Sequence, residues 1–422
     1  MRFPAGFLWG ASTSSYQIEG GNENSALAAW ERKKGWEPCG KAADSWRLWQ
    51  EDIRCLERLN LKAYRFSVEW SRVEPSPGVF DPAALARYAA MADALKRAGI
   101  RPMACLHHFS EPAWLFRENP AGWMSEEAPR RFLRFSERVV GALKESVSDW
   151  LTFNEPMVWL TAGYALGHFP PGVRRFWDMG RLFREQGLFR HVLLAHREAY
   201  QLIHREVPQA RVSIAQNVTA LEPATGSAAD AAAVETWDHF MHRELLDAMK
   251  AEGTLDFLGI NYYTRVFVRR SWMPLVPFRA FAAHAEIEKM LGPFLFRLLG
   301  GRRGDGVLTD MGWEIVPEGF ERVLRAFWER YRLPILVTEN GTADGDGSRR
   351  ESYLRSHLGS MLSAMEAGVP VEGYLHWSLM DNYEWGSYAP KFGLFRVDRK
   401  TFERTPAAGA EYYARVAKTG EL

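Results

Sequence analysis

Two glutamates stand shortly after apolar runs, where a carboxylate would lie at the end of a buried strand. Glu339 lies in "VTENG", after the apolar run 333–336, and Glu155 lies in "TFNEP". Two carboxyl groups that meet in space can divide the work of an acid and of a nucleophile or base. Cleavage of a glycosidic bond uses a carboxyl pair in this way.

Polar and aromatic side chains stand at the ends of the other apolar runs. Amides could bind sugar hydroxyls, and aromatic rings could pack against the C–H face of a sugar. A polar residue at one strand end is often only a cap, so the prediction rests on the coincidence of many. The residues are Arg65, His107, His108, Asn154, Asn217, Asn261, Tyr262, Tyr263, Trp377, Glu384 and Trp385.

Runs rich in β-branched and aromatic residues alternate with helical patterns along the chain. One helix reads clearly: Asp81 fits its N-cap, Pro82 its first position and Gly99 its end. The predicted strands are Phe7–Ser14, Lys62–Trp70, Arg101–Phe109, Asp149–Glu155, Arg211–Val218, Phe257–Thr264, Pro334–Glu339 and Gly373–Asp381. Such alternation favours a single (β/α)8 TIM barrel with long loops on the catalytic face, and an open doubly wound sheet is the alternative.

The composition predicts one soluble domain. No Pro/Gly/Ser-rich linker divides the chain, so we expect a single catalytic domain over residues 1–422. A net charge of +1 indicates neither nucleic acid nor an acidic substrate as partner. The cysteines Cys39, Cys55 and Cys105 have no metal-ligand spacing and fit a reducing compartment. Without a signal peptide or a membrane-spanning run, we expect a cytoplasmic protein.

An ordered set of motifs extends the comparison beyond single residues. The motifs are "FLWGASTSSYQIEG" at 7–20, "YRFSVEWSR" at 64–72, "NEP" at 154–156, "INYYT" at 260–264, "DMGWEIVPEG" at 310–319, "TENG" at 338–341, "HWSLMDNYEW" at 376–385 and "KFGLFRVD" at 391–398. The set resembles glycoside hydrolase family one, the β-glucosidases and β-glycosidases. "GYLHWSL" and "LHHF" are most similar to its archaeal-type branch.

The resemblance implies roles for individual residues. Glu155 would be the general acid/base and Glu339 the nucleophile. Arg65 and Tyr263 would flank the nucleophile, and Asn261 would help to position the acid/base. The glycone would be bound by Gln17, His108, Asn154, Trp377, Glu384 and Trp385, and Trp313 would line the aglycone side.

The resemblance also implies a reaction. It is the two-step, retaining hydrolysis of terminal β-D-glucosides, and of β-galactosides or fucosides, through a covalent glycosyl-enzyme. We expect no metal and no cofactor. The cation of Arg65 would lower the pKa of Glu339, and repulsion between carboxylates would raise that of Glu155. Because Glu155 is not replaced by Gln, O-glycosides are expected, and the carboxylate of Glu384 would repel a sugar phosphate.

Three further interpretations concern an alternative function, a possible metal site and two apolar segments. A catalytically silent sugar-binding barrel is the alternative function, and the oligomeric state is unknown. His239 and His242 could hold a metal, but we interpret them as a plain helical surface. The segments 169–190 and 265–303 are unusually apolar and basic. They could pack on each other or at a subunit interface, or form a rim that contacts lipid or a membrane surface.

Overall fold

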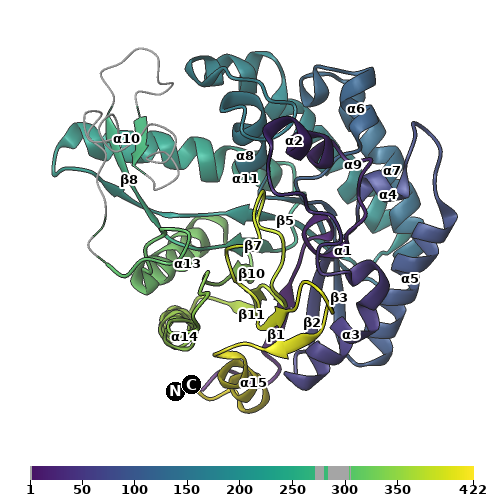
Figure 1. The fold of residues 1–422 in the computed structure, drawn as a ribbon. Coiled ribbons are helices and arrows are strands. Elements are labelled where there is room, and N and C mark those ends of the chain that lie inside the picture. The colour runs from purple at the N-terminus through teal and green to yellow at the C-terminus, as the bar shows by residue number, and fades with distance from the viewer. Residues whose placement is uncertain (1, 271–279, 284–303, 305) are drawn as a thin grey trace.

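Eight parallel strands close into a barrel in the computed structural model, which describes residues 2–270, 280–283, 304 and 306–422 (Figure 1). The strands are β1 (Leu8–Ser12), β2 (Ala63–Ser67), β3 (Arg101–His107), β4 (Asp149–Asn154), β5 (Arg211–Asn217), β7 (Leu258–Asn261), β10 (Ile335–Asn340) and β11 (Val371–Trp377). They neighbour one another in this order, and β11 pairs with β1. The predicted TIM barrel is confirmed, and the open sheet is excluded.

Helices surround the barrel (Figure 1). They are α1 (Ser15–Glu19), α2 (Ala26–Lys34), α3 (Ser45–Arg58), α4 (Trp70–Val73), α5 (Pro82–Arg97), α6 (Ala113–Glu118), α7 (Glu127–Leu143), α8 (Pro156–Leu160), α9 (Leu188–Glu206), α10 (Ala228–Asp238), α11 (Glu244–Ala251), α13 (Pro317–Tyr331), α14 (Arg350–Glu366) and α15 (Ala410–Thr419). The turns η1 (Gly122–Met124) and η3 (Phe176–Asp178) are 3₁₀; η2 (Thr161–Ala165), η4 (Arg181–Glu185) and η5 (His239–Arg243) are π-helical.

Helix α5 begins and ends as its sequence predicts. The Asp81 side chain accepts hydrogen bonds from the backbone N–H groups of Ala83 and Ala84, at 2.8 and 3.2 Å. Pro82 occupies the first helical position, where no intrahelical N–H is needed. Gly99 follows the helix with a φ of 70°, a left-handed conformation that glycine adopts without steric cost.

Short strands outside the barrel were not predicted. β6 (Ala220–Pro223) pairs in parallel with β8 (Arg265–Arg270), and β8 pairs with β9 (Ala280–Ala283). β12 (Phe395–Val397) pairs with β13 (Arg404–Pro406). The chain therefore leaves the barrel after β5 and β7 and forms a second sheet from the two departing segments.

Alternation along each barrel strand separates two apolar layers. Ala63 of β2 belongs to a small cluster with Leu151, Leu336 and other inward-facing residues. Tyr64, the next residue, packs in the large cluster shared with the surrounding helices. Arg65 has the parity of Ala63, so this arginine points into the barrel, where its Nη1 donates to the Thr338 carbonyl of β10 at 3.1 Å.

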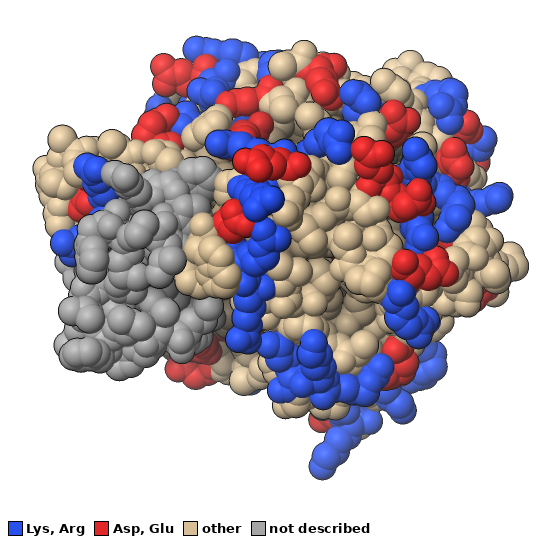
Figure 2. Space-filling view, turned by 90° about the horizontal axis from the view of Figure 1, so that it is seen from above, with Lys and Arg blue, Asp and Glu red and all other residues tan. Residues whose placement is uncertain are grey.

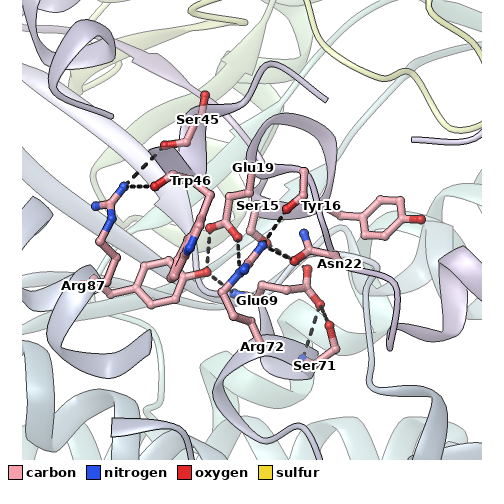
Figure 3. A network of polar contacts seen from close by, with 12 residues as sticks. Ser15, Tyr16, Glu19, Asn22, Ser45, Trp46, Glu69, Ser71, Arg72 and Arg87 are labelled. Atoms are coloured by element: carbon pink, nitrogen blue, oxygen red, sulfur yellow. Dashed lines mark hydrogen bonds and ion pairs between the residues drawn. The ribbon is translucent and has the colours of Figure 1, made fainter. Parts of the chain in front are cut away.

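A buried polar network fastens helix α1 to the turn after β2 (Figure 3). Glu19 Oε2 lies 3.0 Å from Arg72 Nε, and Tyr88 Oη donates to Glu19 Oε1. Burial raises the pKa of Glu19 to about 7, and the Arg72 cation opposes the rise. The Ser15 N–H of α1 also donates to Ser67 Oγ of β2 at 2.7 Å, so the elements that carry Gln17 and Arg65 are held together.

Candidate active site

Glu339 stands near the end of β10 in contact with a cation and a phenol. Its Oε1 lies 2.8 Å from Arg65 Nη1, and Tyr263 Oη donates to its Oε2 at 2.5 Å. Glu339 is 3% exposed and Arg65 is fully buried. Burial raises the pKa of Glu339, although Arg65 and Tyr263 act to lower it. Arg65 thus has the expected effect on the pKa of Glu339, and burial, which the sequence does not give, acts in the opposite direction and is larger.

Glu155 follows β4 and has only neutral hydrogen-bond partners. Its φ of 45° is left-handed, an unusual conformation for a residue with a side chain. Its Oε1 accepts from Asn261 Nδ2 at 2.7 Å and from Asn217 Nδ2 at 3.1 Å. Burial and the negative charge of Glu339 raise the pKa of Glu155 to about 7. The group is therefore partly protonated at neutral pH, as an acid catalyst must be.

Asn261 belongs to a network of side chains that come from four strands and surround the two carboxyl groups. Its Nδ2 lies 3.1 Å from Asn154 Oδ1 as well as donating to Glu155. Its Oδ1 accepts from Thr338 Oγ1 at 2.6 Å, and Asn154 Oδ1 accepts from Arg65 Nη2 at 2.7 Å. The side chains from β2, β4, β7 and β10 therefore form one connected network, which restricts the position of each member.

Three rings gather beside this network. The ring of His108 stacks near Trp377 at 5.8 Å and 25°, and near Trp385 at 6.1 Å and 27°. His108 Nδ1 lies 3.1 Å from Arg65 Nη2. Burial and the Arg65 cation hold the pKa of His108 well below its ordinary value, so the ring is neutral. Neutral imidazole and two indoles can bind a sugar through hydrogen bonds and ring faces.

Glu384 and Gln17 add polar groups near the Trp377 ring. Trp377 Nε1 donates to Glu384 Oε1 at 3.3 Å, and Gln17 Nε2 donates to Asn382 Oδ1 and the Tyr383 carbonyl at 3.1 and 2.9 Å. The buried Gln17 Oε1 has no hydrogen-bond partner within the described part of the chain. Burial raises the pKa of Glu384 to about 8, so the group is mostly protonated at pH 7. The predicted repulsion of a phosphate is therefore weak at neutral pH.

Trp313 packs against a cluster that contains Trp377 and Tyr263, the tyrosine that donates to Glu339. Its ring centroid is 5.3 Å from Tyr263 and 6.2 Å from Phe392. Sequence reasoning missed Phe169, whose ring is 5.7 Å from Trp385 and 6.4 Å from Trp36. The only signal for Phe169 was an aromatic residue in the segment after β4, which is too common to select one position.

Some residues at strand ends do not reach the site. His107 packs on the outside of the barrel, 4.7 Å from the Trp159 ring, and Tyr262 donates its hydroxyl to the Val316 carbonyl at 2.7 Å. The interpretation of His242 as helical surface is wrong, since this residue is 4% exposed. Within the described residues, no three His, Cys, Asp or Glu side chains could together hold a metal ion.

Segment 169–190 mostly packs inward. Its buried apolar residues are Phe169, Met179, Leu182, Phe183 and Leu188. Phe176 and Trp177 are 40% and 50% exposed. Four arginines pair with acidic side chains, as Arg175–Asp178, Arg181–Glu185, Arg184–Glu244 and Arg190–Glu126.

Figure 2 shows basic side chains in a band beside an area of uncharged residues, with acidic side chains touching the band.

Most of the segment 265–303, including Trp272, Phe294 and Phe296, lies outside the described residues. Over the ranges that the structure covers, no helix has the length and apolar character needed to cross a bilayer.

Two buried carboxyl groups at the carboxyl ends of barrel strands, among amides and indoles, define a glycoside hydrolase site. The chain belongs to glycosyl hydrolase family 1, whose family model matches residues 1–253 and 244–422. This finding confirms the resemblance seen in the sequence. The chain is therefore an O-glycosyl hydrolase of the β-glucosidase type, in a family that hydrolyses with retention.

Similar proteins cover the whole chain. Beta-glucosidase A of Thermotoga maritima is 30% identical, over 100% of this chain and 99% of the relative. The structure of a β-glycosidase from Pyrococcus horikoshii is 33% identical, covers 100% of this chain and 96% of its own, and has a TM-score of 0.89. A Thermotoga maritima family 1 enzyme complexed with a cyclophellitol analogue is 29% identical, with coverages of 100% and 99% and a TM-score of 0.86.

Proposed function

We propose that the protein hydrolyses terminal β-D-glucosides with Glu339 as nucleophile and Glu155 as acid/base. The contrast between their environments carries this assignment. Glu339 contacts the Arg65 cation and the Tyr263 hydroxyl, which both favour a carboxylate. Glu155 contacts only amide donors, and its pKa of about 7 keeps part of it protonated.

The first step forms a covalent intermediate. The Glu339 carboxylate attacks the anomeric carbon while the bond to the aglycone oxygen breaks. Glu155 donates its proton to that oxygen, so the aglycone leaves as a neutral alcohol or phenol. Glu339 is then an ester and carries no charge.

The second step uses the charge that the first step removed. Because repulsion from Glu339 is one of the two main causes of the raised pKa of Glu155, esterification of Glu339 lowers that pKa. Glu155 can then ionise and take a proton from water. The water oxygen attacks the anomeric carbon and releases Glu339, and two inversions leave the β configuration.

The glycone would lie against Gln17, Asn154 and His108, with Trp377 and Trp385 beside it. The buried acceptor Gln17 Oε1 suits a sugar hydroxyl, since it has no partner within the residues the structure describes. Galactose differs from glucose only in configuration at C4, and fucose is 6-deoxygalactose, so both present most of the same hydroxyls to this set of groups. Galactosides and fucosides are therefore proposed as further substrates, and Trp313 is proposed to contact the aglycone.

Hydrolysis of 4-nitrophenyl β-D-glucoside tests the proposal. Nitrophenol should be released, and NMR of the first product should show β-glucose before mutarotation. α-Glucose as the first product would overturn the retaining mechanism. The matching galactoside and fucoside would rank the glycones.

A catalytically silent sugar-binding barrel is the second candidate. A rice relative, 29% identical over 100% of this chain and 92% of the relative, is called probable inactive beta-glucosidase 14. Sugar binding without release of nitrophenol, with the protein folded, would select this alternative. The presence of both Glu155 and Glu339 favours the enzyme.

We further propose that the chain forms one domain that acts in the cytoplasm. Barrel closure pairs β1, the first barrel strand, with β11, the last, so the barrel strands should unfold together. The thiols of Cys39, Cys55 and Cys105 are free and buried, which suits a reducing compartment.

Contact of segment 169–190 with lipid is also proposed, and its support in the described residues is the exposure of Phe176 and Trp177. Failure of the protein to co-sediment with anionic liposomes at low salt would exclude such contact.

A further inference from the structure

The π-helical turn η5 holds the end of strand β5 on both sides of Asn217. Gln216 Nε2 donates to the Met241 carbonyl at 2.8 Å. The backbone N–H of Thr219 and its hydroxyl each lie 3.3 Å from His242 Nε2. π-Helical turns are rare and are frequent at functional sites. The backbone around Asn217 is therefore set by contacts to η5 as well as by the barrel.

The hydrogen on His242 can be assigned from its partners. His242 Nδ1 lies 2.8 Å from Asp238 Oδ1, and Asp238 Oδ2 lies 2.7 Å from Arg243 Nε. Burial acts to raise the pKa of Asp238, but the hydrogen bond from His242 and nearby cations lower it overall. An ionised carboxylate only accepts, so Nδ1 carries the hydrogen. In the neutral ring Nε2 is then an acceptor, which matches the N–H of Thr219.

The turn that His242 holds carries contacts to the acid/base. Asn217 is the last residue of β5 and donates to Glu155 Oε1 at 3.1 Å. The N–H of Val218 donates to the Asn261 carbonyl at 2.9 Å, and Asn261 is the other donor to Glu155. A displacement of this turn would therefore move Asn217 directly, whereas the Asn261 side chain is also held by Thr338 and Asn154.

We propose that His242 is a positioning residue for the acid/base, an inference that rests on the role proposed for Glu155. His242 accepts from Thr219 and thereby holds the turn at which Asn217 donates to the Glu155 carboxyl. His242 itself does not touch the substrate, and it acts through Asn217. This role also gives a function to a histidine that the hydrolytic steps do not use.

The sign of the expected effect follows from the Asn217 hydrogen bond. That bond favours the ionised form of Glu155 and lowers its pKa. Its loss raises the pKa of the acid, so the basic limb of kcat/KM moves to higher pH. A net hydrogen bond of about 0.5–1.5 kcal/mol corresponds to a movement of about 0.4–1 pH unit.

The experiment compares His242→Ala, Asn217→Ala and the double variant by kcat/KM for 4-nitrophenyl β-D-glucoside between pH 5 and 9. Both single variants should move the basic limb upward, and the double variant should move it no further than Asn217→Ala does. His242→Gln should restore part of the wild-type profile, because its amide oxygen can accept from Thr219.

A second His–Asp pair provides a matched control at the other end of β5. His204 Nε2 lies 2.9 Å from Asp256 Oδ2, and this oxygen accepts from the Val212 N–H at 2.7 Å. His204→Ala should lower the melting temperature and leave the basic limb in place. If His242→Ala does not fold, Asp238→Asn keeps the size of the pair and favours hydrogen on Nε2, which should move the limb in the same direction.

The outcomes separate this inference from the proposed function. If Asn217→Ala moves the limb and folded His242 variants do not, His242 is only structural and the inference is overturned. If Asn217→Ala leaves the limb in place while Glu155→Ala behaves as an acid variant, the inference is again overturned. If Glu155→Ala shows no acid defect, the role of Glu155 itself fails.

Discussion

Tyr263→Phe removes one contact of Glu339, the proposed nucleophile, and preserves the shape of the site. The lost hydroxyl donates to Glu339 Oε2, and the Tyr263 side chain is 8% exposed. Burial and the Glu339 carboxylate raise the pKa of Tyr263 well above its ordinary value. The hydroxyl is therefore a donor throughout the pH range of an assay, and its removal is a single, defined change.

The size of the effect follows from the kind of hydrogen bond. A hydrogen bond to a charged group contributes about 1.5–3 kcal/mol, and about 1.4 kcal/mol is a factor of ten in rate. We expect kcat/KM to fall about 10- to 150-fold on the acidic side of the profile. Without the donor the pKa of Glu339 rises, so the acidic limb moves to higher pH, and the loss narrows once Glu339 is fully ionised.

The assay is kcat/KM for 4-nitrophenyl β-D-glucoside from pH 4.5 to 8.5, with thermal unfolding measured in parallel. Tyr262→Phe is the matched control, because that hydroxyl donates to the Val316 carbonyl away from the carboxyl pair. It should destabilise the fold by about 1 kcal/mol and leave the acidic limb unchanged. An unmoved limb in Tyr263→Phe, or an equal movement in both variants, would refute the reasoning.

Three further substitutions change the carboxyl groups of the site themselves. Glu339→Ala should abolish nearly all turnover, with azide restoring a reaction that gives an α product; near-normal rates without azide would contradict its role. Glu155→Ala should suffer most with poor leaving groups, and azide should give a β product; equal losses on good and poor leaving groups would argue against an acid. Glu384→Ser should raise the ratio of 6-phospho-glucoside to glucoside activity. Wild-type discrimination should sharpen from pH 7 to 9 as Glu384, with its pKa of about 8, ionises, and an unchanged ratio in the variant would remove Glu384 from the glycone site.

The barrel strands could be predicted because each is covered on both faces. A parallel strand between an inner cluster and outer helices reads as a nearly continuous apolar run, as in β10. β6 and β8 carry no such signal. β6 has four residues and includes Pro223, and it pairs with a segment that follows another barrel strand. Their pairing depends on where the barrel places both segments, which local sequence does not contain.

Residue types at the site could be predicted, but the balance of forces could not. The sequence indicates that a cation approaches Glu339, yet it does not give the depth of burial that raises the pKa. His242 shows a different limit. The surface interpretation rested on the lack of a third metal ligand in the sequence, whereas the buried ring of His242 lies between Asp238 and Thr219, a residue from a distant part of the sequence.

Barrel closure between β1 and β11 has a consequence for synthesis. Residues from Leu8 to Ser12 pair with residues from Gly373 to Trp377. During synthesis β1 therefore emerges from the ribosome long before β11, its pairing partner, has been made. At about 5–20 residues per second, that delay is on the order of 20–70 s. During it β1 has an open edge, which invites association with other nascent chains. The ring of strands around Glu155 and Glu339 is complete only after β11 pairs with β1. We therefore expect the newly synthesised enzyme to be inactive until its last barrel strand is in place.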